Sequence, residues 1–213
     1  MSITRARDSQ HPEALHLSEE GLRIYRILAQ SGSIQFRRML AVALGTHSRC
    51  CYEVGQHDSA LLAAEEAVEI YRRLSDQEVD GMDVGFASAL SKLAACLHHD
   101  GQTAESLRAS ALAIDTLGET DTELDVWRQK VLCDALICHA VFLCCSGEYE
   151  AALSASERGV DIARQMATNW PERVQISVAW ALLNRANYLS TTGLYADAID
   201  CADEAFDICR TLA

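Results

Sequence analysis

The chain has 213 residues, of which 49% are hydrophobic and 23% are charged, and it contains only 11 glycines and two prolines. This composition excludes a disordered or fibrous protein and disfavours an all-β fold, which would need more turn residues. The formal net charge of −13 argues against nucleic acid or an anionic membrane as the main partner, because phosphate groups are bound by basic surfaces.

Two further features of the sequence concern location. The apolar runs are interrupted by charge or glycine before they reach the ~18 residues of a membrane-spanning helix. The first eight residues, Met1 to Asp8, lack the apolar segment of a secretory signal. We therefore expect a cytoplasmic protein.

The nine cysteines lie inside apolar periodic stretches and form no Cys-x-x-Cys pair. This pattern is typical of small core side chains in a reducing compartment, and it lacks the ligand spacing of a zinc site. We expect all nine to be core residues, and we expect neither a metal nor a cofactor.

The chain repeats itself every 46 residues, and the repeat is marked by a glycine at positions 55, 101, 147 and 193. Apolar or small residues stand 11, seven and four positions before each glycine, which predicts a first helix, called helix A. A second apolar and small pattern follows each glycine and predicts helix B. The segment 12–28 matches 58–74, so a half repeat opens the chain. In chain order we expect a half repeat over 10–30 and full repeats over about 35–75, 82–118, 127–166 and 172–213.

The segment 59–74 reads SALLAAEEAVEIYRRL, and it resembles the phrase E-A-L-x-A-x-E-E-A-V-x-x-Y-R-R-L of tetratricopeptide repeat arrays. With a 46-residue unit, the sequence is similar to the long-helix arrays of kinesin light chains and of bacteria and fungi. The resemblance implies an all-α protein, a right-handed α-solenoid of antiparallel helix pairs forming a single domain over 1–213. It also implies a non-catalytic scaffold that binds a protein or peptide on a concave surface lined by the A helices.

Helix A positions at fixed distances before each glycine line that concave surface in the family. The resemblance therefore names candidate peptide-binding residues, which are Arg49, Tyr52, Ser88, Lys92, Asp134, Trp180, Asn184 and Asn187. The A helices together carry a net charge of +3 and the B helices −10, so the A helices favour an acidic or carboxylate-ended peptide. Arg49, Lys92, Asn184 and Asn187 are the strongest candidates, because Arg and Lys pair with carboxylates and Asn donates to a peptide backbone. For each of them, an ordinary solvated helix residue is the alternative interpretation.

Histidines and acidic loops supply the alternatives to a scaffold. The run His98, His99 and Asp100, with His57 and Asp58 in a neighbouring turn, is the best candidate for a metal or acid–base cluster. Consecutive histidines on a helix diverge by about 100°, which disfavours a shared ligand, and no catalytic motif is present, so we expect no enzyme.

Two smaller patterns have mainly structural interpretations. Asp121, Glu123 and Asp125 form an acidic loop that would suit a metal or a basic peptide, but charges that cap the next helix are the favoured interpretation. His47 and His139 both stand eight residues before a repeat glycine, which indicates a repeated packing role.

The ends of the chain suggest a different function. The chain begins on a B helix without its A partner and ends inside the last B helix, which carries Ile199, Phe206 and Ile208. Solenoid ends need polar caps for solubility. The alternative to a peptide-binding scaffold is therefore an assembly or sensor segment of a longer multidomain signalling protein, acting through end-to-end stacking or self-association.

Overall fold

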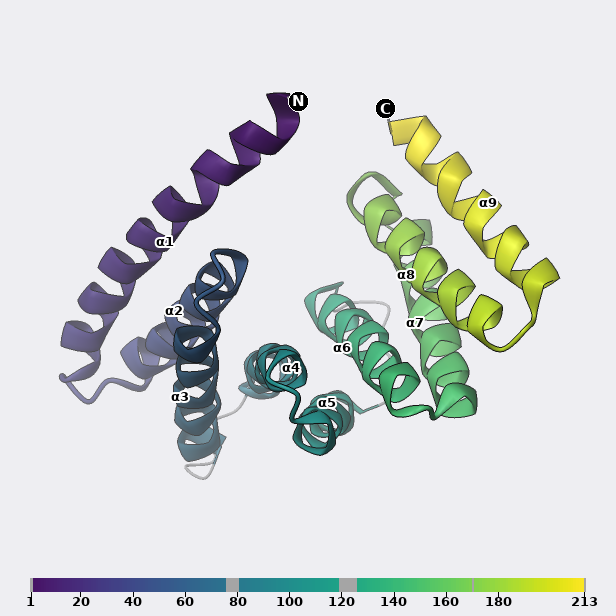
Figure 1. Ribbon diagram of the computed structural model, residues 1–213. Coiled ribbons are helices and arrows are strands. Elements are labelled where there is room, and N and C mark those ends of the chain that lie inside the picture. The colour runs from purple at the N-terminus through teal and green to yellow at the C-terminus, as the bar shows by residue number, and fades with distance from the viewer. Residues whose placement is uncertain (1, 76–80, 119–125, 170, 213) are drawn as a thin grey trace. The chain divides into compact units, whose positions relative to one another are not determined.

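The computed structural model describes residues 2–75, 81–118, 126–169 and 171–212, with side chains over 11–75, 81–118, 126–168 and 175–211. All regular structure in these ranges is α-helical, which confirms the all-α fold. The helices, labelled in Figure 1, are α1 (Ser2–Ala29), α2 (Ile34–Glu53), α3 (His57–Ser75), α4 (Asp83–His99), α5 (Thr103–Leu117), α6 (Val126–Ser146), α7 (Tyr149–Asn169), α8 (Pro171–Thr191) and α9 (Tyr195–Leu212). No helix in the described part of the chain is long and apolar enough to cross a membrane.

The helices follow one another as A and B members of a repeat, with α2, α4, α6 and α8 as A helices and α1, α3, α5, α7 and α9 as B helices. Helix α8 begins at Pro171, a residue that suits the first turn because its missing N–H is unpaired there in any helix. Helix α1 begins at Ser2 and continues through Pro12, where the repeat alignment starts.

The chain divides into two compact units, Met1–Ala109 and Ser110–Ala213, and the division falls within α5. In unit 1, α2 packs against both α1 and α3, and α4 packs against α3 and α2. In unit 2, α7 packs against both α6 and α8, and α9 packs against α8. Each A helix of these units thus has at least one B helix beside it.

The repeat glycines end the A helices in a common way. Gly55, Gly101, Gly147 and Gly193 have φ of 80°, 79°, 85° and 83°, a region that costs other residues steric strain. In the first turn, the Gly55 N–H donates to the Tyr52 carbonyl at 3.0 Å and the next N–H donates to the Cys51 carbonyl at 2.9 Å. The other three turns repeat this pair of bonds, which is the Schellman type of helix end. The same C-terminal helix cap therefore recurs every 46 residues.

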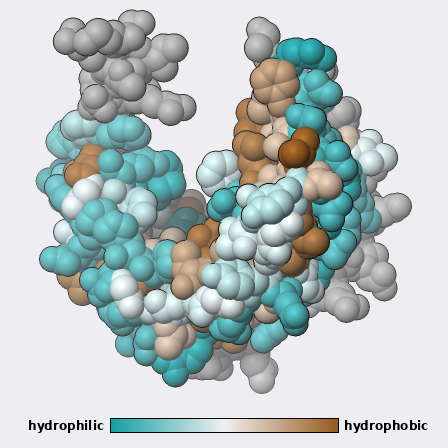
Figure 2. Space-filling model, turned by 45° about the vertical axis from the view of Figure 1, so that its right-hand side comes forward, coloured by the Kyte–Doolittle hydropathy of each residue, from teal (hydrophilic) through white to brown (hydrophobic). Residues whose placement is uncertain are grey.

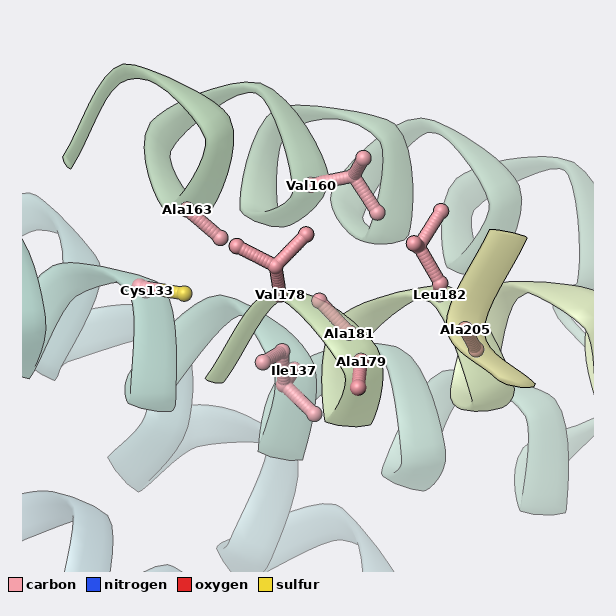
Figure 3. Packing of buried hydrophobic residues seen from close by; sticks show 9 residues of the cluster. All are labelled: Cys133, Ile137, Val160, Ala163, Val178, Ala179, Ala181, Leu182 and Ala205. Atoms are coloured by element: carbon pink, nitrogen blue, oxygen red, sulfur yellow. The ribbon is translucent and has the colours of Figure 1, made fainter. Parts of the chain in front are cut away.

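The core of unit 2 is formed by side chains from four helices. Figure 3 shows this cluster, in which small and branched side chains meet: Cys133, Ile137, Val160, Ala163, Val178, Ala179, Ala181, Leu182 and Ala205. The alanines allow the backbones to approach closely, and Leu182 fills the space between α8 and its neighbours with no exposed surface.

The cysteines follow the expected pattern only in part. Cys50, Cys51, Cys96 and Cys133 are buried, as expected of core residues. Cys145 and Cys209 are exposed, so the core prediction is wrong for these two. Cys145 follows Cys144 directly, and one step along a helix turns a side chain by about 100° away from its neighbour.

Candidate functional site

In unit 1, four of the predicted binding residues lie on α2 and α4. The Arg49 guanidinium donates to Glu53 Oε1 at 2.6 Å, one turn along α2. The Lys92 ammonium donates to Ser88 Oγ at 2.6 Å, and its aliphatic stem crosses to α2, where a Cβ at Gly45 would lie 3.3 Å from Lys92 Cδ. Arg49 is exposed, and Lys92 is half-buried because Gly45 leaves room for its stem.

Tyr52 belongs to an aromatic cluster at the ends of three helices. The rings of His57, the first residue of α3, and His99, the last residue of α4, stack with centroids 3.8 Å apart. Tyr52 meets both rings edge-on at 5.4 Å. Stacked imidazoles lie in nearly parallel planes, so their nitrogens do not converge on one ion. Among the described residues, no group of three His, Cys, Asp or Glu side chains is arranged to hold a metal.

In unit 2, the remaining predicted residues lie on α6 and α8. Asp134 on α6 is exposed and accepts a hydrogen bond from Lys130 Nζ at 2.8 Å. On α8, the Asn184 amide donates to the Trp180 carbonyl at 2.8 Å, and Asn187 is exposed one turn further along. The Trp180 side chain is 61% exposed.

Trp180 has two apolar neighbours that the sequence analysis did not single out. Ile176 is 75% exposed and Leu183 is 47% exposed. With Trp180 they are spaced by four and three residues, so they form one stripe along α8, which we call the α8 stripe. Figure 2 shows hydrophobic side chains gathered over the C-terminal helices of unit 2. The signal that could have found the stripe is its phase, because the buried residues Val178, Ala179, Ala181 and Leu182 fall on the other side of the helix.

His47 takes part in a chain of hydrogen bonds between α1 and α2. Ser18 Oγ donates to the Leu15 carbonyl at 2.7 Å and lies 2.9 Å from His47 Nδ1. His47 Nε2 lies 3.4 Å from Cys51 Sγ. Since the Ser18 proton is already donated, this network assigns the histidine proton to Nδ1 and makes Nε2 the acceptor of the thiol.

A cysteine beside a histidine is also the arrangement of a catalytic nucleophile and its base. The environment of Cys51 does not support that role. Burial is the main cause that raises the pKa of the Cys51 thiol and lowers the pKa of the His47 imidazole, so both groups are held neutral. Cys51 also has no exposed surface from which it could reach a substrate.

The Ser–His contact recurs in unit 2, which confirms the packing role expected for these histidines. Ser110 Oγ lies 2.7 Å from His139 Nδ1, and both residues are 92 positions beyond Ser18 and His47. In the repeat between them the corresponding positions hold Ala64 and Leu93. The acidic loop residues Asp121, Glu123 and Asp125 lie outside the described residues.

Comparison with known proteins identifies the architecture. Residues 178–213 match the family model described as tetratricopeptide repeat. No curated protein matches the sequence. Among solved structures, a putative kinesin light chain from Podosopora anserina with nearly identical TPR-like repeats has a TM-score of 0.65 and 17% identity, covering 98% of this chain and 92% of that chain.

Two other solved structures are similar to this chain. The apo form of RapI has a TM-score of 0.63 at 16% identity, covering 94% of this chain and 52% of that chain. PlcR from Bacillus thuringiensis, solved with the peptide PapR7 and DNA, has a TM-score of 0.58 at 13% identity, covering 99% of this chain and 72% of that chain. At these identities the likeness establishes the fold alone. The sequence resemblance to tetratricopeptide repeat arrays is thereby confirmed.

Proposed function

We propose that this chain is a non-catalytic module that binds a protein or peptide segment on the exposed faces of its A helices. The observation that carries the proposal is the α8 stripe. Three large apolar side chains stand in line on one helix, and contiguous exposed apolar side chains rimmed by polar groups are a feature of protein-interaction surfaces. We place the module in the cytoplasm, because its nine cysteines are all free.

Polar groups beside these faces indicate the chemistry of the partner. Asn187 follows the α8 stripe by one turn, where its amide is placed to bond to a peptide backbone. In unit 1, Arg49 and Lys92 supply positive charge on the A helices, whereas the acidic residues concentrate on the B helices. This distribution favours an acidic or carboxylate-ended segment, drawn by local charge.

The fold agrees with a binding role, and the Cys–His contact described above does not support a catalytic one. The contact of Cys51 with His47 joins a fully buried thiol to a half-buried imidazole, and burial holds both groups neutral. PlcR, which has a similar fold, was solved with a peptide. PapR7 is a ligand of PlcR. For this chain, the PlcR structure supports only the proposal that the ligand is a peptide.

The test is selection of binding peptides from a random library on the wild-type protein, followed by fluorescence anisotropy with each selected peptide. We expect Trp180→Ala to weaken binding by about tenfold or more, since exposed tryptophans are frequent hot spots. The matched control is Tyr149→Ala, which removes an exposed aromatic ring from B helix α7 and should leave affinity unchanged. Selected peptides that bind Trp180→Ala and wild type equally well would place the binding surface elsewhere.

A second candidate function, assembly through the last helix, is favoured by Phe206. Three of the four corresponding positions in other repeats are buried, with Leu22 at 7%, Val68 at 4% and Val160 at 0% exposure, and the fourth, Ile114, is half-buried. Phe206 itself is 66% exposed. A large ring at a position built for burial supports end-to-end stacking or self-association through α9.

Sedimentation velocity over a wide range of concentration tests this second function. Self-association through α9 predicts a dimer at high concentration that Phe206→Ser abolishes. Leu62→Ser is the matched control, because Leu62 is also 66% exposed but lies on α3. If the wild-type protein sedimented as a monomer at every concentration, self-association through α9 would be excluded.

A further inference from the structure

Unit 1 contains a cavity that the sequence analysis did not anticipate. Its volume is about 540 Å³, and it lies between α1, α2 and the C-terminal half of α3. This volume falls within the range of about 300–1,000 Å³ typical of sites for small ligands. Its lining combines apolar side chains with charged ones: Arg26, Ala29, Gln30, Arg37, Leu40, Glu66, Glu69, Ile70, Arg73 and Leu74.

The two carboxylates of the lining are already paired. Glu66 accepts a hydrogen bond from Arg26 at 2.7 Å, which joins α3 to α1. Glu69 accepts from Arg73 at 2.7 Å and lies 3.3 Å from Arg72. Three guanidinium groups therefore face two carboxylates, and the negative charge of the cavity is neutralised before Arg37 is considered.

Arg37 is the unbalanced charge of this cavity. Its side chain is half-buried, and no ion pair joins it to a carboxylate within the part of the chain that the structure describes. It lies in the first turn of α2, where the N-cap residue Ser33 makes no side-chain bond to the helix. The free N–H groups of this helix start add positive potential beside the guanidinium.

The positive charge is specific to this repeat. One, two and three repeats further along, the position of Arg37 holds Asp83, Gln129 and Gln175. A cavity between α7, α8 and α9 in unit 2 has five carboxylates against two arginines, the opposite balance. The α1–α2–α3 cavity is thus distinguished from its relatives in the same fold by charge and not only by shape.

Apolar side chains complete the cavity. Leu40 of α2 and Leu74 of α3 are buried residues of its lining, and Ile70, also in the lining, is half-buried. A ligand that suits this arrangement has an anionic group for Arg37 and an aliphatic body for the leucines and Ile70.

We propose that the cavity between α1, α2 and α3 binds a small aliphatic carboxylate, with the carboxylate on Arg37 and the chain on Leu40, Ile70 and Leu74. This site uses other residues than the peptide-binding proposal, so the two stand or fall separately.

Octanoate is the probe, titrated into the full-length ¹⁵N-labelled protein and followed by amide chemical shifts. We expect saturable shifts confined to residues 26–40 and 66–74. Arg37→Gln should weaken octanoate binding by about tenfold or more, because it removes a charge-assisted hydrogen bond to the carboxylate. Arg38→Gln is the matched control, because it removes the same charge from the next residue, which does not line the cavity. It should bind octanoate as wild type does.

Octanol and inorganic phosphate separate the two halves of the proposed recognition. We expect each to bind at least about tenfold more weakly than octanoate, since octanol lacks the charge and phosphate lacks the aliphatic body. Equal binding of octanol and octanoate would overturn the role of Arg37, and equal binding of phosphate and octanoate would overturn the role of the leucines. Absence of saturable shifts, or unchanged affinity in Arg37→Gln, would overturn the site itself.

Discussion

Gly85 on α4 is required by the ring of Tyr71 on α3. A Cβ at this position would lie 2.5 Å from the Tyr71 hydroxyl oxygen and 2.6 Å from the ring carbon that carries it. Tyr71 is 3% exposed, so close packing on every side leaves the ring little freedom to move aside. The absence of a side chain at Gly85 therefore sets how closely α3 and α4 approach.

We predict that Gly85→Ala lowers the free energy of unfolding by about 1–3 kcal/mol through overpacking. Gly21→Ala is the control, since a Cβ there meets no atom within 4 Å in helix α1. It should raise the free energy of unfolding by about 0.5–1 kcal/mol, as alanine in a helix interior does. Urea denaturation measures the free energy of unfolding of both variants. If the two variants were equally stable, the ring of Tyr71 would have moved aside to make room for the new methyl group.

The His47 network predicts a dependence of stability on pH. Burial lowers the pKa of His47, Glu19 raises it to a smaller extent, and Arg26 adds to the lowering. The unfolded chain takes up a proton near the ordinary histidine pKa of about 6.5, before the folded protein does, so stability falls as pH drops below that value. The same holds for His139, whose pKa is also lowered mainly by burial, against Glu148 and Asp115.

Replacing Ser18 and His47 together by alanine and leucine should remove the contribution of His47. The chain itself uses Ala64 and Leu93 at the corresponding positions of the next repeat, so this pair suits the packing. Between about pH 7.5 and about pH 5.5, we expect the melting temperature of wild type to fall further than that of the double variant. Parallel curves for the two proteins would contradict the assignment of a neutral His47.

At the scale of elements, the B helices are joined by one ion pair that occurs twice. Arg26 of α1 pairs with Glu66 of α3 at 2.7 Å, and Arg164 of α7 pairs with Glu204 of α9 at 2.6 Å. The two pairs are three repeats apart in sequence. Both are exposed, so each contributes at most about 1 kcal/mol, and the helices are held mainly by their apolar faces.

Leu136 tests that conclusion. It is 1% exposed on α6, and it lies against Gly159 of α7. Leu136→Ala should lower the free energy of unfolding by about 2–5 kcal/mol, because it leaves a cavity that the helices cannot close. Leu112→Ala, at a 44% exposed position on α5, should change it by less than about 0.5 kcal/mol. Equal melting temperatures for Leu136→Ala and wild type would contradict the helix register.

At the scale of the whole molecule, the repeat fold implies that stability is local. Packing in such arrays is between neighbouring helices, and the chain divides into two compact units. Leu136→Ala should therefore speed amide hydrogen exchange in α6, α7 and α8 while α1 to α3 keep their protection. Faster exchange throughout the chain would mean that the units unfold together.

The sequence predicted much of this fold because its strongest signals are local. The glycine spacing located the four helix ends, and the small-residue pattern located the faces that pack. Only Trp180 of the α8 stripe was predicted, because Ile176 and Leu183 differ from the buried residues of α8 in their phase on the helix and not in their residue type. The cavity at Arg37 was not predicted, for another reason. Its existence depends on the distance between α1 and α3 beside the N-terminus of α2, and residue spacing along the chain does not encode that distance.

The Ser–His contact occurs twice, two repeats apart, with Ala64 and Leu93 at the positions between, and this has a consequence for how such a gene changes. Repeats of similar sequence invite unequal recombination, which deletes or duplicates whole units. A recombination that joins a B helix carrying serine, as at Ser18, to an A helix carrying leucine, as at Leu93, would leave the serine without its histidine partner. The opposite recombination would place a histidine, as at His47, beside an alanine, as at Ala64, so that Nδ1 of the histidine would lose its hydrogen bond. Exchange by two repeats between the Ser18–His47 and Ser110–His139 contacts preserves the match, whereas exchange by a single repeat breaks it. In this part of the chain the contact therefore favours recombination in steps of two repeats.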